Sequence, residues 1–133
     1  MCARTDRKKI GTDNKQWGEF CENLAAEYFM KEGYTIRERR WRMGRYEIDL
    51  ILEHERTIIF VEVKGRALGL QDPVDAVDRD KRRRIITAAD VYLRQLTVLY
   101  QYRFDIFTVV GDKTSYTTHH YPDAYLPSVN SGR

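Results

Sequence analysis

The stretch YEIDLILEHERTIIFVEVKGR, residues 46–66, decides how this chain folds. Its apolar residues are leucines, phenylalanine and β-branched residues, and the pattern predicts two β-strands joined by a polar turn at Glu53–Arg56. Charged residues nevertheless lie inside both predicted strands. They are the carboxylates Glu47, Asp49 and Glu62 and the ammonium of Lys64.

The register of the predicted hairpin decides whether these charges meet. Strand side chains alternate between the two faces of a sheet, so residues two apart share a face. We expect Leu52 to pair with Thr57 across the turn, which places Glu62 opposite Glu47. Asp49 and Glu62 are then diagonal neighbours on one face, roughly 7–8 Å apart at the backbone. A one-residue change of register would put them on opposite faces.

Two converging carboxylates repel each other unless a cation neutralises them. Mg²⁺ is typically held by one or two carboxylates with water and substrate phosphate, and the backbone carbonyl of Val63 offers a further ligand. Lys64 shares a face with Glu62 and could stabilise phosphate charge or position an attacking water, which suits metal-assisted phosphodiester hydrolysis with Mg²⁺ or Mn²⁺. The alternative is an amphipathic strand with Glu62 and Lys64 facing water. Asp49 is harder to explain that way, because Asp is depleted in strands.

The whole chain has the size and composition of one soluble domain. It has 133 residues, 42% hydrophobic and 32% charged, which is enough for a single core and too few for two. No apolar run reaches the length of a membrane span, and the polar start MCARTDRKKIGTDNK lacks a signal-peptide core, so we expect a cytoplasmic protein without a membrane partner. Cys2 and Cys21 are too few for a disulfide framework or a zinc site.

The net charge of +3 is distributed unevenly. One basic cluster surrounds Trp41 and another lies near residue 80, and clustered basic residues are the expected footprint of a phosphate backbone. The alternative is two solvated faces balanced by the 20 acidic residues elsewhere. Trp41 either stacks on an unpaired base or packs against the first helix. The candidate nucleic-acid contacts are Arg40, Arg42, Arg45, Arg79, Arg82 and Arg83.

Apolar spacing predicts two helices and further strands around the hairpin. Helical spacing runs over residues 16–32, where Gly33 supplies a stop, and a second helix lies between Asp72 and Gln95. Further strands are predicted at residues 34–42 and 102–111, with a short edge strand at 116–126. This order predicts an α/β fold with a mixed sheet flanked by helices. We expect one domain at residues 15–126, a disordered lead-in at 1–14 and a frayed tail at 127–133.

Six blocks of sequence, taken in order, resemble one family. They are WGEFCENLAAEYFMKEGYTI, RRWR, EIDLI, FVEVKGR, KRRRIITAADVYL and YRFDIFTV. Over Trp17–Ala124 the chain resembles the YraN-like family of uncharacterised bacterial proteins, which is similar to the archaeal Holliday-junction resolvases of the PD-(D/E)xK nuclease superfamily. The resemblance implies a restriction-endonuclease-like core, with a mixed sheet flanked by helices and a metal site on the central hairpin.

The resemblance also implies roles for individual residues. Asp49 matches the metal-binding aspartate of the superfamily, and Glu62 and Lys64 match the two ends of its E-x-K element. Glu19 matches the acid on the first helix that completes the site in resolvase-like members. These matches make Asp49, Glu62 and Lys64 the catalytic candidates. The metal-ligand candidates are Asp49, Glu62, Glu19 and the carbonyl of Val63.

Two further residues have supporting roles by the same comparison. Glu47 matches the glutamate of the family's G-E-I-D-L block, although Tyr46 stands where the family has glycine, which puts the local backbone and access to the site in doubt. Lys81 matches a lysine in the second helix. It falls on the apolar stripe between Val77 and Ile85, where an unpaired lysine is costly. It either points toward the carboxylates or a phosphate, or extends to solvent.

Three polar residues near the end of the chain are assigned structural positions. Asp105 matches a family aspartate in the block RFD, and we expect it to pair with an arginine. His119 and His120 are adjacent, so on a strand they point opposite ways and make a poor joint metal site.

The function implied is a Mg²⁺- or Mn²⁺-dependent endonuclease that hydrolyses phosphodiester bonds in structured or branched DNA. Two alternatives stay open: a catalytically inactive nucleic-acid-binding module on the same fold, and a protein-interaction domain. Resolvase-like proteins usually work as two-fold dimers, so by analogy the chain is a candidate homodimer.

Overall fold

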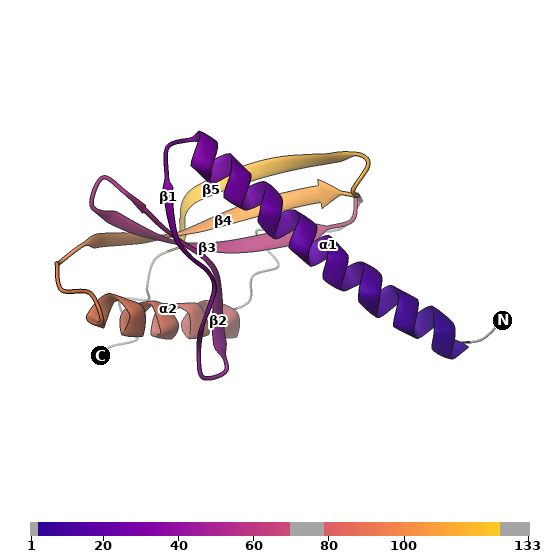
Figure 1. Cartoon of the computed structure of the whole chain (residues 1–133), viewed down its shortest axis with the longest axis horizontal. Coiled ribbons are helices and arrows are strands. Elements are labelled where there is room, and N and C mark those ends of the chain that lie inside the picture. The colour runs from indigo at the N-terminus through magenta and orange to yellow at the C-terminus, as the bar shows by residue number, and fades with distance from the viewer. Residues whose placement is uncertain (1–2, 70–78, 126–133) are drawn as a thin grey trace.

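The computed structural model describes residues 3–69 and 79–125, with side chains described from residue 13. Two helices and five strands form a mixed α/β core (Figure 1), as the sequence predicts. Among the described residues, no helix combines the length and the apolarity needed to cross a membrane. The elements are α1 Ala3–Lys31, β1 Thr35–Met43, β2 Tyr46–His54, β3 Thr57–Arg66, α2 Arg79–Arg94, β4 Gln101–Gly111 and β5 Tyr116–Tyr125.

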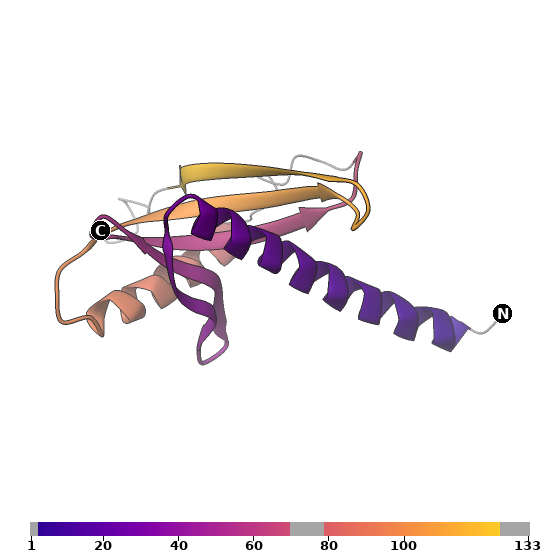
Figure 2. The ribbon, with the colours of Figure 1, turned by 45° about the horizontal axis from the view of Figure 1, so that its top comes forward.

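The five strands form one sheet in the order β1-β2-β3-β4-β5. Strands β3 and β4 are parallel and are connected through α2, whereas the other neighbouring strands are antiparallel. The two helices cover opposite faces of the sheet (Figures 1 and 2). Alternation along β3 divides the core accordingly, because Phe60 packs in the cluster under α2 and Val61 in the cluster under α1.

Helix α1 ends where the sequence predicts and begins earlier. Gly33 has a left-handed φ of 92°, and Tyr34 N donates to Phe29 O (2.9 Å) while Gly33 N donates to Met30 O (3.1 Å). These two bonds form a Schellman cap, which glycine favours at this position. At the other end the helix reaches back to Ala3, so most of the expected disordered lead-in is helical. The apolar spacing marks where the helix begins to pack, not where its backbone becomes helical.

The turn of the β2–β3 hairpin is tighter than the sequence suggests. His54 pairs with Thr57, so only Glu55 and Arg56 form the turn, and both have positive φ angles of 48° and 63°. The predicted pairing of Leu52 with Thr57 is therefore wrong by two residues. A shift of two residues keeps every side chain on its predicted face, so the shared face of Asp49 and Glu62 survives the correction.

The second helix and the last strand refine two other expectations. Helix α2 is 16 residues long and begins at Arg79; Val77, assigned to its apolar stripe, lies outside the described residues. Strand β5 lies at the edge of the sheet, as predicted, and its 10 residues fill nearly all of the predicted segment 116–126.

Close contact between α1 and β3 depends on Gly65. A Cβ atom at this position would lie 2.5 Å from Trp17 Nε1 and 2.7 Å from Cys21 Sγ, which is closer than real Cβ atoms approach. Glycine therefore lets the helix rest directly on the backbone of the strand that carries Glu62 and Lys64.

We predict that Gly65→Ala lowers the free energy of unfolding by about 1–3 kcal/mol, because Trp17 and Cys21 must move to admit the methyl group. The matched control is Gly18→Ala in α1, where a Cβ has nothing within 4 Å and alanine favours helix by roughly 0.5–1 kcal/mol. Denaturant unfolding of both variants measures the difference. Equal stability of the two variants would contradict the contact.

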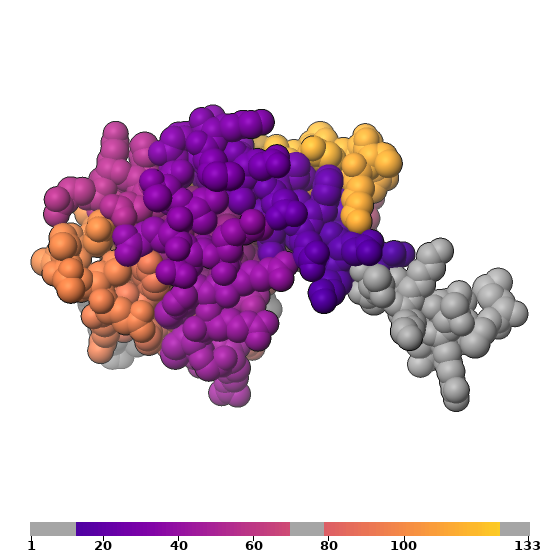
Figure 3. All heavy atoms as spheres, viewed as in Figure 1, coloured from indigo at the N-terminus to yellow at the C-terminus, as the bar shows by residue number. Residues whose placement is uncertain are grey.

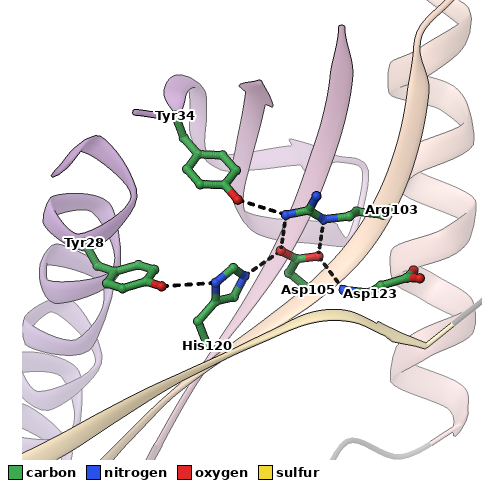
Figure 4. A network of polar contacts seen from close by, with 6 residues as sticks. All are labelled: Tyr28, Tyr34, Arg103, Asp105, His120 and Asp123. Carbon is green, nitrogen blue, oxygen red and sulfur yellow. Dashed lines mark hydrogen bonds and ion pairs between the residues drawn. The ribbon is translucent and has the colours of Figure 1, made fainter. Parts of the chain in front are cut away.

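A buried carboxylate ties β4 to β5 and α1 (Figure 4). Asp105 is fully buried and accepts hydrogen bonds from Arg103 Nε (2.9 Å) and from the backbone N–H of Asp123 (2.9 Å). His120 Nε2 lies 2.7 Å from Asp105 Oδ2, and its Nδ1 lies 3.3 Å from the Tyr28 hydroxyl. The expected pairing of Asp105 with an arginine is confirmed. Burial alone would raise the pKa of Asp105, yet the hydrogen bonds from His120 and Arg103 hold it below its usual value.

We predict that Asp105→Asn destabilises the protein by about 3 kcal/mol at neutral pH, because Arg103 and His120 lose their buried anionic partner. A carboxyl group with a lowered folded pKa stabilises above its unfolded pKa of about 3.9. The difference in free energy of unfolding between wild type and variant should therefore disappear as pH falls through the lower, folded-state pKa of Asp105. Urea unfolding across acid pH measures it.

The control for this prediction is Asp90→Asn, which changes an exposed ion pair with Arg94 within α2 and should cost less than about 0.5 kcal/mol. If Asp105→Asn remained equally destabilising at pH values below both the folded and the unfolded pKa of Asp105, the loss of stability would come from packing rather than from charge.

Candidate active site

The candidate site lies where β2 and β3 part. Their pairing ends at Leu50 with Val61, while β3 continues to pair with β4 as far as Arg66. Beyond that point β2 turns away from β3 together with β1 (Figure 1). The backbone N–H of Val63 donates instead to Asp49 Oδ2, at 2.8 Å. A gap therefore opens in the sheet beside the middle of β3.

The two central carboxylates face each other across this gap. The last register pair brings Asp49 level with Glu62, and the side chain of Glu62 is only 3% exposed. Burial, followed by the nearby charge of Glu62, raises the pKa of Asp49 well above its usual value. The N–H and C=O of one strand residue point to the same side, so the Val63 carbonyl also faces β2. Three oxygen-bearing groups thus converge where the strands separate.

Two lysines accompany the carboxylates. Lys81, on the first turn of α2, forms an ion pair with Glu62 Oε1. Of the two roles considered for this residue, the structure supports the one directed at the carboxylates. Lys64 is 9% exposed, and burial together with repulsion from Lys81 lowers its pKa. Burial alone would lower the pKa of Lys81, but the charge of Glu62, the hydrogen bond to it and the charge of Asp49 together raise this pKa.

From α1, the charge of Glu22 acts on this site. Its charge raises the pKa of Asp49 further, and its Oε1 accepts from Arg40 Nε at 2.6 Å. Glu19, the residue expected to complete the site, acts electrostatically on Arg40 and has no contact with Asp49 among the interactions of the described residues. The two acids are three residues apart and share a helix face, so spacing alone does not separate them.

The first basic cluster is largely occupied by internal ion pairs. Arg40 pairs with Glu22, and Arg42 Nε lies 2.8 Å from an oxygen of Glu47. Glu47 is therefore placed beside β1 rather than beside the two central carboxylates. Arg45 is exposed at the turn between β1 and β2.

The second basic cluster opens α2 near the site. Arg79 is exposed, and Arg83 lies 3.7 Å from Asp80 with its side chain 75% exposed. Arg82 is half-buried, with its guanidinium carbon 5.0 Å from the ring centre of Tyr125. The Arg82 Nε and the Tyr125 hydroxyl are both buried and have no hydrogen-bond partner among the described residues. Sequence reasoning did not connect these two residues.

Trp41 does not pack against the first helix. Its ring meets Tyr92 of α2 edge-on, with centroids 5.2 Å apart, and it joins the core cluster beneath that helix. The expectation of a contact with α1 is wrong because the twisted β1–β2 arm carries this residue to the opposite face of the sheet.

The donor set suits a hard divalent cation such as Mg²⁺ or Mn²⁺. Asp49 and Glu62 supply carboxylate oxygens and Val63 supplies a carbonyl oxygen. Among the described residues, no group of three or more His, Cys, Asp or Glu side chains is placed to hold a metal ion. A two-carboxylate site leaves coordination positions for water and a phosphate oxygen, which is the usual arrangement for Mg²⁺.

Comparisons with known proteins agree with the sequence blocks. A UPF0102 protein of Phocaeicola vulgatus is 40% identical over 118 residues, which cover 88% of this chain and 98% of that one. UPF0102 proteins of Bacteroides thetaiotaomicron and Lawsonia intracellularis are each 36% identical, over 116 and 110 residues; the matches cover 86% and 81% of this chain, and 96% and 83% of theirs. The sequence model of the family described as "Uncharacterised protein family UPF0102" matches residues 21–109 of this chain. That segment includes Glu22, Asp49 and Glu62. The chain therefore belongs to the uncharacterised protein family UPF0102, the YraN-like family.

Proposed function

We propose that this protein is a metal-dependent endonuclease that hydrolyses phosphodiester bonds in structured or branched DNA. The observation that carries the proposal is the parting of β2 from β3, which leaves Asp49 level with Glu62 and the Val63 N–H bonded to a carboxylate. In a strand pair with a purely structural role, these backbone groups would be paired with each other and the two carboxylates would not lie opposite one another.

The residues of the site divide the work of hydrolysis. Asp49, Glu62 and the Val63 carbonyl would hold Mg²⁺ or Mn²⁺, which when bound activates water and neutralises phosphate charge. Lys64 would place its Nζ beside the attacked phosphate, where it orients the water or stabilises developing charge. Lys81 lies close enough to Glu62 to turn toward a second phosphate oxygen. Glu22 holds Arg40 next to the site.

The charge around the gap favours a polyanionic substrate. Arg79, Arg83 and Arg84 are exposed on α2 beside Lys81, and Arg45 is exposed on the β1–β2 arm. Basic side chains on two separate elements can follow two segments of a phosphate backbone. This distribution supports a branched substrate over a short linear one.

The test of the proposal is metal binding followed by cleavage. In calorimetric titrations with Mn²⁺ and Mg²⁺, we expect saturable binding to the wild type and a loss of at least about tenfold in affinity for Asp49→Asn. With four-way branched DNA and Mn²⁺, cleavage should fall by roughly a hundredfold or more in Asp49→Asn and Lys64→Ala. Asp90→Asn, an exposed change on α2, should match the wild type in both assays.

Equal metal binding and equal cleavage by wild type and Asp49→Asn would overturn the proposal. A second candidate function, a nucleic-acid-binding module without catalysis, is favoured by the exposed arginines of α2. It would be indicated by salt-dependent DNA binding that survives Asp49→Asn but weakens when Arg79 and Arg83 are neutralised.

We predict that Lys81→Met raises the affinity for Mn²⁺ by about tenfold while it lowers cleavage. The Lys81 ammonium occupies the Glu62 oxygen that a cation would bind, so a cation must displace it. Calorimetry of the metal alone measures the first effect, and cleavage of branched DNA measures the second. Arg83→Met, which removes an equal charge from the exposed side of α2, is the control and should leave the metal affinity near that of the wild type. An unchanged or weaker Mn²⁺ affinity in Lys81→Met would show that Lys81 does not compete for the site.

A further inference from the structure

A cavity of about 710 Å³ lies at the end of the sheet, beyond the carboxylates. Its walls come from three places: the turns of α1 around Asp13–Trp17, the end of β3, and the turn between β4 and β5. In Figure 3 the indigo atoms of α1 and the yellow atoms of β5 meet at this end of the molecule. The lining residues that matter here are Asp13, Trp17, Gly65, Arg66, Asp112 and Lys113.

The cavity lies beside the end of β3 on the side of the sheet that α1 covers, whereas Glu62 and Lys64 of the candidate active site lie on the α2 side. Arg66 follows Lys64 by two residues, so it shares the face of that residue and lies about 7 Å further along the strand. Gly65, between them, belongs to the cavity wall. A polymer held at Glu62 and Lys64 would reach this cavity by passing Arg66 and the end of β3.

An indole forms the aromatic wall of the cavity. Trp17 is half-buried, and it is stacked on Phe20 with ring centroids 5.7 Å apart and planes 21° apart. Phe20 in turn meets Tyr116 of β5 edge-on at 5.4 Å. Because Gly65 has no side chain, Trp17 lies against the strand backbone in a fixed position. A rigid, partly exposed indole is a suitable surface for a base to stack on.

The polar residues of the cavity suit a nucleotide rather than a purely apolar ligand. Arg66 and Lys113 offer positive charge to a phosphate. The Asp112 carboxylate is already used, because it accepts from Thr114 N (2.9 Å) and Ser115 N (2.9 Å) to hold the β4–β5 turn. Asp13 remains as an exposed acceptor for a sugar hydroxyl or a base edge. The volume is within the range of about 300–1,000 Å³ typical of small-molecule sites.

We propose that this cavity binds an unpaired nucleotide of a nucleic acid strand, with its base stacked on Trp17 and its phosphate between Arg66 and Lys113. The inference rests on the proposed function, since it assigns the nucleotide to the strand that passes Lys64. It narrows the substrate class to nucleic acid with unpaired bases beside the cleaved bond, as at a branch point or flap.

The test uses the full chain with the substitution Trp41→Phe, so that Trp17 is the one remaining tryptophan of the sequence. An oligothymidine of about a dozen nucleotides is titrated without metal at about 0.1 M salt, and Trp17 emission is recorded. We expect saturable quenching, with affinity about five- to tenfold weaker in both Lys113→Glu and Arg66→Ala. Arg94→Ala removes the same charge as Arg66→Ala, at the far end of α2 (Figure 1), and should change affinity by less than about twofold.

A duplex of the same length should leave Trp17 emission unchanged, because its bases are already paired and stacked. Absence of quenching by the single strand, equal quenching by the duplex, or an equal loss from Arg94→Ala would each overturn the inference. The two proposals fail separately. If the protein did not bind Mn²⁺ but the oligothymidine still quenched Trp17, the endonuclease proposal alone would fail. If Mn²⁺ bound but Trp17 was not quenched, the nucleotide-site proposal alone would fail.

Discussion

The candidate site depends on one constraint, the end of backbone pairing between β2 and β3 after Leu50 and Val61. A strand that loses one neighbour leaves backbone donors and acceptors that need other partners. The Asp49 carboxylate satisfies the N–H of Val63 and is thereby held level with Glu62. The continuous pairing of β3 with β4 keeps this strand straight while the β1–β2 arm departs. The same geometry therefore provides both the opening and the groups that surround it.

The carboxylates of Asp105, which is buried, and Asp49, which is half-buried, show opposite electrostatic arrangements. Asp105 is fully satisfied by Arg103, His120 and a backbone N–H, and its pKa is lowered. Asp49 has one backbone donor and an acidic neighbour, and its pKa is raised. A satisfied buried anion contributes to stability, whereas crowded acids at a perturbed pKa are typical of functional sites. By this contrast Asp105 has the electrostatics of a structural acid, and Asp49 has those of a candidate functional acid.

The fold, and the shared face of Asp49 and Glu62, could be predicted from the sequence because both depend on the periodicity of apolar residues along helices and strands. Alternation in residues 46–66 places Asp49 and Glu62 on one face under any even shift of register. The two-residue turn could not be predicted, because Glu55 and Arg56 adopt positive φ angles that such residues rarely take. The effect of Glu22 on Asp49 and the packing of Trp41 on α2 depend on how α1 and the β1–β2 arm are oriented in space, which periodicity does not encode.

The contact of α1 with Gly65 has a consequence for the chemistry of Cys21. Burial of this side chain, and to a lesser degree the charge of Glu22, raises the pKa of the thiol to about 12. The reactive thiolate is therefore almost absent at neutral pH, and the folded protein shields the sulfur from alkylating agents and oxidants. Modification of Cys21 requires α1 to lift from the sheet. The rate at which Cys21 is alkylated therefore measures how often α1 separates from the sheet, next to the strand that carries Glu62.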